Sequence, residues 1–416
     1  MDLPKMIKIR QEFKTHSIQD IPGTIQSEFK NFKPERLITP GQTVAITAGS
    51  RGIGNIDVIT REIINCLKQI GADPFIVPSM GSHGGATAEG QTEVLRHYGI
   101  TETAMGAPIK SSMEVVPVGH TDEGLPVYID KIASQADHII VVNRIKTHTD
   151  FEAPIESGLM KMIAIGLGNQ EAADKYHLDF VNNGYYSVIT SVARKVLEKC
   201  KITFGVGIVE NQKEETEIIQ LIPADSFEKT EEELLLKSKQ LFPRIPLSPV
   251  GLLIVDKMGK TYSGTGMDQN VIARSTASIH NVPSFPKIAR IFVRDLALAS
   301  NGNASGIGNA DFTTQRLVDK IDIDASYVNV ITAVGTELIR IPLHFKTDRE
   351  VIDTAGKVIP DFTAEKARVV RIKNTLDLEE MLISEAMIPE AEMIENLSII
   401  GSSKPTEFDV EGNLLH

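Results

Sequence analysis

The first half of the chain alternates short β-branched, apolar runs with longer stretches in which apolar residues recur at helical spacing. TVAITAG (43–49) and DPFIVPSM (73–80) are predicted strands, and IDVITREIINCLKQIGA (56–72) is a predicted helix between them. AEGQTEVLRHYGI (88–100) is a second predicted helix, with Thr87 at its N-cap. This alternation predicts a parallel sheet whose strands are joined by right-handed crossovers.

A further strand, HIIVV (138–142), is short and branched enough to be buried in the middle of that sheet. The segment that follows it contains Lys146, His148 and Lys161 among glycines and small residues. Open α/β folds bind their ligands at the carboxyl ends of the strands, so we expect this segment to lie at the binding edge of the sheet.

The second half begins after the proline-punctuated stretch FPRIPLSP (242–249), which we take as the domain boundary. A strong apolar strand follows at 250–258, and the stretch DLEEMLISEAMI (377–388) is predicted to be a helix. The strand-like run LSIIG (397–401) lies beyond that helix.

The predicted fold class is α/β, with two α/β domains, parallel-rich sheets and an active-site cleft between the domains. The predicted N-terminal catalytic and cofactor-binding domain covers residues 1–245, and the C-terminal α/β domain covers 246–395. The C-terminal segment, 396–416, is predicted to return to the N-terminal domain.

Charge and composition narrow the classes of partner. The net charge of -12 over 416 residues argues against nucleic acid or an anionic membrane surface as the main partner. No apolar run is long enough to span a membrane, and the first residues lack the apolar core of a signal peptide. With only two cysteines, Cys66 and Cys200, we expect a cytoplasmic protein with buried thiols and no cysteine-based metal cluster.

Two glycine-rich turns should emerge at the same sheet edge as the segment after 138–142. GSRGIGN (49–55) does not have the spacing of a dinucleotide fingerprint, but Ser50 and Arg51 stand where free backbone N–H groups would hold a phosphate or carboxylate. The alternative is a tight turn with a surface arginine. GSHGGAT (81–87) holds His83 between residues with little steric cover, which suits proton transfer; the alternative is a turn histidine that caps the next helix.

Two further residues are candidates for holding a cofactor. Lys161 lies in the small, apolar setting SGLMKMIAIGLG, where an ammonium must be paired, neutral or covalently occupied; the alternative is a side chain that extends to the surface. His177 can bind a metal through neutral imidazole, although no compact metal-binding pattern surrounds it. His148, taken alone, is as consistent with a hydrogen-bonded loop histidine as with a catalytic one.

Several of these stretches, in this order, resemble the nickel-pincer-dependent lactate racemase family of 2-hydroxyacid racemases and epimerases. The resemblance covers most of the chain, most clearly residues 40–275. Its motifs are ITAGSRG, GSHGGATAEGQ, KTHTDF, SGLMKM, His177 and SGTGMDQN.

That resemblance implies a role for each matching residue. His83 and His148 would be the acid/base pair on opposite faces of a 2-hydroxy acid. Lys161 would carry the tethered nickel-pincer nucleotide, a pyridinium bisthiocarboxylate mononucleotide with nickel, and His177 would be the protein ligand to nickel. Arg51 would contact cofactor and substrate. The resemblance also implies cofactor-synthesis proteins as partners, so protein made in a host without them would lack the cofactor.

The remaining matches concern the substrate-holding and cofactor-holding residues. Ser50, Asp268 and Asn270 fit the cofactor-binding pattern. Ala48 replaces an aspartate of the lactate enzymes, and their glutamine and lysine near SGTGMDQN are replaced by Ala273 and Thr276. Arg274 stands between these two and either holds the substrate carboxylate or ion-pairs with a neighbouring acid such as Asp268. These departures predict a substrate other than lactate.

Three hypotheses follow from the sequence. The first is a racemase or epimerase of a 2-hydroxy acid that uses reversible hydride transfer to the tethered cofactor. The second is a dehydratase or dehydrogenase of the same fold. The third is a non-catalytic protein that binds an anionic metabolite or a metal–nucleotide cofactor.

Overall fold

A computed structural model describes residues 2–13, 15–50, 52–149, 151–277 and 280–415, without the side chains of His177, Leu178 and Thr332. The chain divides into two compact units. We call residues 15–148 and 153–242 the N-terminal unit, and residues 1–14, 149–152 and 243–416 the C-terminal unit.

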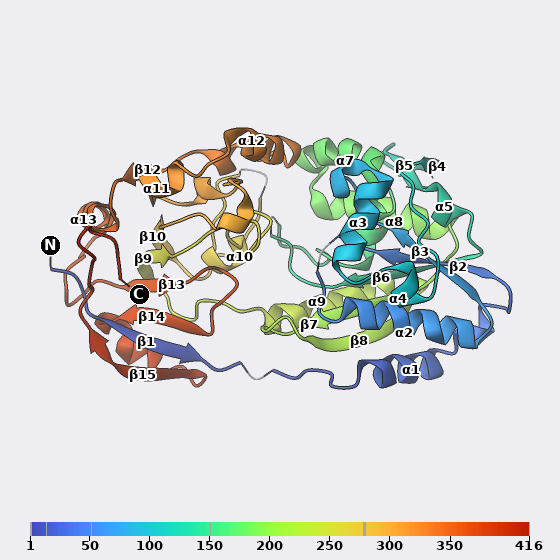
Figure 1. Ribbon diagram of the computed structural model, residues 1–416, viewed down its shortest axis with the longest axis horizontal. Helices are drawn as coiled ribbons and strands as arrows, with labels where there is room; N and C mark the ends of the chain where they lie inside the picture. The colour runs from blue at the N-terminus through green and yellow to red at the C-terminus, as the bar shows by residue number, and fades with distance from the viewer. Residues whose placement is uncertain (1, 14, 51, 150, 278–279, 416) are drawn as a thin grey trace. The chain divides into compact units, whose positions relative to one another are not determined.

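The N-terminal unit is built on a five-stranded sheet of order β3-β2-β6-β7-β8 (Figure 1). β2, β3, β6 and β7 run parallel, and β8 is antiparallel to β7. The strands span β2 (Thr43–Ala48), β3 (Asp73–Pro78), β6 (His138–Arg144), β7 (Ile202–Glu210) and β8 (Thr216–Pro223). The predicted parallel sheet is therefore confirmed, with the buried run 138–142 at its centre.

Helices cover both faces of this sheet. Apolar side chains of α1 and α2 form one core with inward residues of the strands, including Phe204 and Val206 of β7. On the opposite face, Gly205 leaves room for Leu159 and Phe227: a Cβ there would lie 2.7 Å from Leu159 Cδ1. The helices are α1 (Ile21–Phe32), α2 (Ile56–Gln69), α3 (Ala88–His97), α4 (Glu102–Met105), α5 (Lys131–Ser134), α6 (Leu159–Lys161), α7 (Asn169–Asn183), α8 (Tyr185–Lys199) and α9 (Phe227–Leu241). A separate hairpin pairs β4 (Val115–His120) with β5 (Pro126–Asp130).

The C-terminal unit contains an eight-stranded sheet of order β12-β11-β10-β9-β13-β14-β1-β15. The first five strands in that order are parallel, and the last three join by antiparallel pairing. Its strands are β1 (Met6–Gln11), β9 (Val250–Val255), β10 (Ile288–Val293), β11 (Phe312–Thr314), β12 (Leu343–Phe345), β13 (Val369–Ile372), β14 (Glu380–Ser384) and β15 (Leu397–Lys404). Its helices are α10 (Gln269–Ile272), α11 (Gln315–Val318), α12 (Ile323–Thr332), α13 (Asp348–Val358) and α14 (Ile388–Ala391).

Two expectations for the chain ends are corrected here. Residues 396–416 do not return to the N-terminal unit, because β15 pairs with β1 inside the C-terminal sheet. The opposite crossing occurs instead, since residues 1–14 belong to the C-terminal unit. The division at 242/243 lies close to the expected boundary at 245/246.

The expected helix at 377–388 is also wrong. Its centre forms β14, whose Met381 and Ile383 are buried on one face of the sheet.

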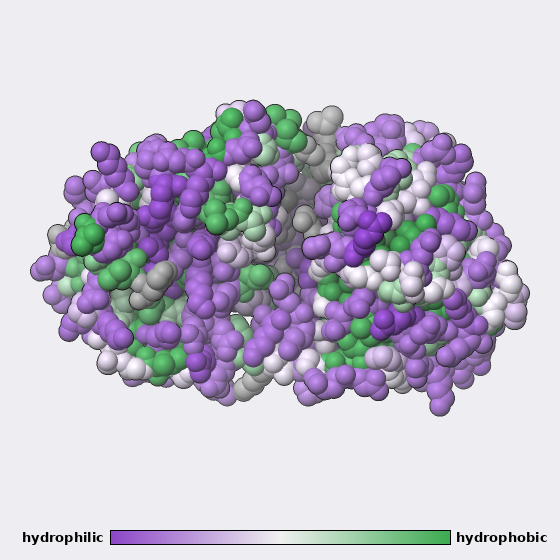
Figure 2. Space-filling model, in the orientation of Figure 1, coloured by the Kyte–Doolittle hydropathy of each residue, from purple (hydrophilic) through white to green (hydrophobic). Residues whose placement is uncertain are grey.

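Charged and polar side chains cover most of the molecular face in Figure 2. Among the described residues, no helix combines the length and the hydropathy needed to cross a membrane.

Candidate functional site

Ser50 and His83 meet at the carboxyl edge of the N-terminal sheet. Ser50 follows β2 and His83 follows β3, and these two strands are neighbours. The Ser50 hydroxyl makes a short hydrogen bond with His83 Nδ1, and the Ser50 carbonyl accepts one from the Tyr98 hydroxyl at 3.1 Å. The Nδ1 contact sets the orientation of the ring, so Nε2 lies on its opposite side.

The turn around His83 depends on glycine. Gly84 has a positive φ of 68°, and a Cβ there would lie 2.6 Å from the backbone nitrogen of Gln91. The next helix, α3, is capped by Thr87, whose hydroxyl accepts from Gly90 N at 3.0 Å. Since Thr87 caps that helix, the alternative that His83 serves as its cap is not what the structure shows.

Hydrogen bonds between its two ends and within it fix the loop that carries His148. Lys146 and Ser157 exchange backbone hydrogen bonds of 2.8 and 3.2 Å after β6 ends. Inside the loop, the Glu156 carboxylate accepts from His148 N at 2.7 Å and from Ala153 N at 3.1 Å. These contacts fix the backbone on both sides of the imidazole.

Glu156 is almost fully buried, at 1% exposure, and Lys239 of α9 compensates its charge at 2.7 Å. Burial nevertheless raises the pKa of Glu156, against the lowering effect of Lys239 and of the two backbone donors. A buried carboxylate that must be paired makes this loop a defined structure rather than a loose connection.

Lys161 lies beside His148. Its Nζ is 2.5 Å from His148 Nε2, and the lysine side chain is half-buried. One of the two nitrogens must donate and the other accept, so the contact couples the protonation of the amine to that of the imidazole. The prediction that Lys161 needs a partner is met at least by His148.

A π-helix follows Lys161 directly, over Met162–Gly166. Such segments are rare in proteins and occur often at functional sites. The π-helix connects the Ser50–His83 pair with the His148–Lys161 pair. A Cβ on Gly49 would lie 3.1 Å from Met162 Cε, and Gly81 N donates to Gly166 O at 3.4 Å. The π-helix therefore packs against both glycine-rich turns, which brings Ser50, His83, His148 and Lys161 to one sheet edge.

A second buried carboxylate supports the helix that carries Lys161. Glu231 of α9 is fully buried and accepts from Met160 N at 3.0 Å through Oε2. Its Oε1 would lie only 2.4 Å from a Cβ on Gly158. Burial raises the pKa of Glu231 to about 7, more than the backbone donors lower it.

Two predicted site residues concern parts of the chain whose side chains are not described. Arg51 lies outside the described residues, and for His177 only the backbone position within α7 is described. Nearby, Phe180 of α7 stacks on Tyr185 at 4.5 Å between ring centroids, and Tyr185 lies 5.9 Å from the His148 ring. The metal role of His177 stays a prediction. No group of three or more His, Cys, Asp or Glu side chains able to hold a metal occurs among the described residues.

The remaining predicted residues lie in the C-terminal unit and make local contacts there. Asp268 accepts from the backbone of Asn270 at 2.9 Å and from its side chain at 3.1 Å, which caps α10. The Arg274 guanidinium binds Asp311 at 2.5 Å and the Ile288 carbonyl at 2.9 Å. These contacts favour the structural alternative for Arg274, with Asp311 in place of Asp268. The cofactor roles of Asp268 and Asn270 stay predictions.

Sequence reasoning missed Glu156, Glu231 and the π-helix. Glu231 carried a readable signal, because it shares helical spacing with the buried Phe227, Leu234 and Ser238. An acid on an apolar stripe indicates a buried carboxylate with a specific partner. Glu156 and the π-helix had no such signal, since they depend on contacts between distant segments.

Cys66 is buried as expected, whereas Cys200 is only half-buried, and both thiols are poor nucleophiles. Neither forms a disulfide, and burial raises the pKa of Cys66 and of Cys200 to about 11. The fold and the site thus define an α/β protein with two histidines, a serine and a lysine at the carboxyl edge of a parallel sheet.

Comparison with known proteins gives one family match. Residues 12–187 match the family model of the lactate racemase N-terminal domain. The predicted family resemblance is therefore confirmed.

Solved structures support the fold. The lactate racemase apoprotein from Thermoanaerobacterium thermosaccharolyticum is similar with a TM-score of 0.55 at 14% identity, over 89% of this chain and 98% of that chain. A Thermotoga maritima protein is similar with a TM-score of 0.51 at 13% identity, over 78% and 84%. At such identities the likeness shows the fold alone. No curated protein matches the chain.

Proposed function

We propose that this chain is a racemase or epimerase of a 2-hydroxy acid, acting in the cytoplasm with a nickel-pincer nucleotide attached to Lys161. The observation that carries the proposal is the placement of Lys161 Nζ 2.5 Å from His148 Nε2. The π-helix after Lys161 contacts the turns of Ser50 and His83. An attachment point and two imidazoles at one sheet edge are what inversion on both faces of a substrate carbon requires.

The residues present fit such a group. Lys161 offers a half-buried amine for covalent attachment, and a Cβ on Gly85 would meet nothing within 4 Å, which leaves open space in the turn after His83. His177 would supply the protein ligand to nickel, and Ser50 would add a polar contact. When bound, the cofactor would accept a hydride from the substrate carbon and return it.

The protein's own residues would handle the protons. One of His83 and His148 would take the substrate hydroxyl proton on one face. The other, already protonated, would return a proton to the same oxygen on the opposite face. Attachment to Nζ removes the ammonium charge of Lys161, so His148 Nε2 no longer faces a cation and is better able to accept a proton.

Arg51, which follows Ser50, is proposed to hold the substrate carboxylate. The replaced residues Ala48, Ala273 and Thr276 make a 2-hydroxy acid other than lactate the better candidate. Cofactor-synthesis proteins are the proposed partners, because the nucleotide must be made and attached before turnover.

Mass spectrometry of the intact protein tests the attachment. Co-expression with cofactor-synthesis proteins should add the mass of the nucleotide to wild type and to Lys146→Ala, but not to Lys161→Ala. Lys146 is the matched control because it belongs to the same sheet edge. A clean, unmodified wild-type mass with the synthesis proteins present would instead favour a non-catalytic or differently catalytic protein of this fold.

Loss of optical purity tests the reaction. Loaded protein should racemise or epimerise at least one member of a panel of single-enantiomer 2-hydroxy acids. No interconversion of any member by protein shown to carry the adduct would refute the proposal.

A further inference from the structure

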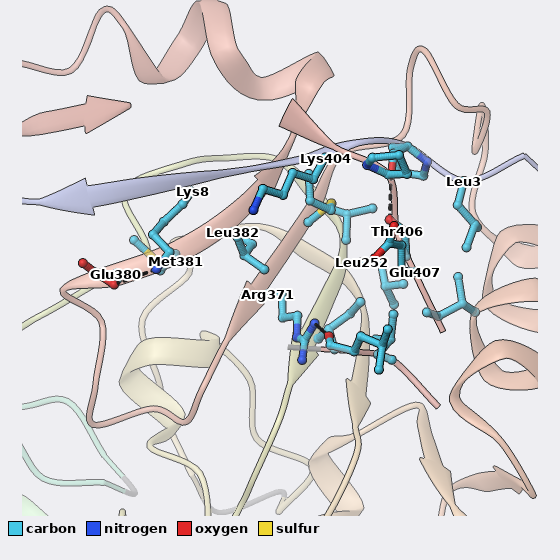
Figure 3. A pocket seen from close by; sticks show the side chains of 18 of the residues that line it. Leu3, Lys8, Leu252, Arg371, Glu380, Met381, Leu382, Lys404, Thr406 and Glu407 are labelled. Carbon is cyan, nitrogen blue, oxygen red and sulfur yellow. Dashed lines mark hydrogen bonds and ion pairs between the residues drawn. The ribbon is translucent and has the colours of Figure 1, made fainter. Parts of the chain in front are cut away.

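A hollow of about 560 Å³ lies on one face of the C-terminal sheet (Figure 3). Its floor follows the register of the strands. Ile254 pairs with Arg371, Arg371 with Leu382, Leu382 with Lys8, and Lys8 with Ile400. We call it the sheet hollow. Its size falls within the range of small-molecule sites, ~300–1,000 Å³.

Much of the lining of the sheet hollow is apolar. A second row of the floor, Leu252, Val369 and Met6, adds apolar surface. Ile352 of α13, Phe362 and the C-terminal Leu414 form an apolar wall beside it. An apolar floor and wall favour a ligand with a hydrocarbon body.

Charged side chains around this surface are mostly basic. Four lining residues are cationic, Lys8, Arg371, Lys373 and Lys404, against two acids, Glu380 and Glu407. Acids in or beside the hollow pair with most of these cations, so the preference for a charged ligand depends on the cation that is left without a partner.

The cations differ in what already binds them. Lys8 pairs with Glu380 at 3.1 Å, and Arg371 donates to Asp256 and to the Leu415 carbonyl, each at 2.8 Å. Lys373 pairs with Asp377 at 2.9 Å. Lys404, at the end of β15, lies opposite Met6 in the pairing of β15 with β1, and its side-chain ammonium has no hydrogen bond or ion pair to any described residue. Figure 3 shows Lys404 and Leu382 at the same hollow. An ammonium without a partner next to apolar surface is suited to the head group of an amphiphile.

We propose that the sheet hollow binds a small amphiphilic anion, with its hydrocarbon body on the apolar floor and its carboxylate at Lys404. This inference does not depend on the proposed racemase activity, because every lining residue belongs to the C-terminal unit.

Binding of dodecanoate to the full-length protein tests the proposal. It is measured as displacement of the fluorescent anion 1-anilinonaphthalene-8-sulfonate. Dodecanoate should bind, and dodecanol and dodecyltrimethylammonium should bind at least about tenfold more weakly, because they lack the charge-assisted contact. Lys404→Glu should weaken dodecanoate by a similar factor. Lys357→Glu is the matched control: Lys357 is exposed in the same unit, does not line the hollow and should leave affinity unchanged.

Ser402→Trp provides a second, charge-neutral variant. Ser402 is exposed on β15 and lines the hollow, so the indole should fill it without disturbing the core and should abolish binding. Equal affinity for dodecanoate and dodecanol, or an unchanged affinity in both Lys404→Glu and Ser402→Trp, would overturn the proposal. So would sedimentation that shows a dimer which Ser402→Trp dissociates, because a second copy would then occupy this face.

Discussion

At the scale of single residues, His83 and His148 are positioned by different contacts, and substitution of either one alone should reduce activity. Ser50 orients one ring through Nδ1, while Glu156 fixes the backbone of the other. Replacing either histidine with alanine should lower kcat of loaded enzyme by roughly 10²–10⁴-fold, the usual size of a general acid–base contribution.

Circular dichroism and the Tm of the His83→Ala and His148→Ala variants should match wild type, because both side chains are in loops. His120→Ala, an exposed histidine in β4, is the matched control and should keep full activity. Retained racemisation in His83→Ala or His148→Ala would remove that histidine from the acid/base pair.

Glu231 should make stability depend on pH. Its pKa rises from an ordinary 4.5 to about 7 on folding, so the folded state binds more protons than the unfolded state between these values. Stability should therefore fall as pH rises through about 4.5 to 7, by on the order of 3 kcal/mol in total. Urea unfolding of Glu231→Gln at pH 5, 6, 7 and 8 should show a smaller fall than wild type.

The matched control for this effect is Glu233→Gln, an exposed acid on the same helix. It should follow the wild-type dependence. The absolute stability of Glu231→Gln is not the test, since a buried amide has its own cost at every pH. Parallel wild-type and Glu231→Gln curves across the window would contradict the assignment.

At the scale of elements, Arg274 joins segments that are distant in sequence. Its guanidinium binds Asp311, just before β11, and backbone carbonyls at Ile288 and Ala289 in β10. Arg274→Ala should therefore lower the free energy of unfolding by about 1 kcal/mol, because partly buried acceptors lose a charged donor. Arg274→Lys should retain part of the stabilisation that Arg274 provides. A variant with unchanged stability and a reduced kcat/KM on the best substrate would restore the substrate-binding role.

Prediction from sequence succeeded where an element is stabilised by its own pattern. The strands at 43–49, 73–80 and 138–142 are buried on both faces, and their apolar runs reflect this directly. The stretch 377–388 misled because Glu, Leu and Met favour helix locally, while pairing of β14 with β13 and β1 decides its conformation. The meeting of the loops of Ser50, His83 and His148 at one sheet edge follows from the same logic, because sheet-edge loops are predictable, whereas the buried Glu156–Lys239 pair is not.

At the scale of the whole molecule, the position of the first strand in the C-terminal sheet could not be predicted from the sequence. MIKIRQ alternates buried and exposed residues, but its partners, β14 and β15, lie at the far end of the chain. No local pattern identifies partners at such separation. The C-terminal sheet is completed only by residues from the other terminus, so its stability must depend on them.

A fragment of residues 243–416 should therefore not fold well alone. Without β1 it would leave β14 and β15 with unpaired edges and remove Ile7 and Ile9, which are 5% and 0% exposed, from the core. Its amide NMR spectrum should be poorly dispersed. Adding a peptide of residues 2–13 should restore dispersion and a cooperative urea transition by strand addition. The same peptide with Ile7→Lys and Ile9→Lys should not, because it would place two charges in the core. A well-dispersed fragment with the same urea midpoint with and without the peptide would show that β1 is dispensable to this sheet.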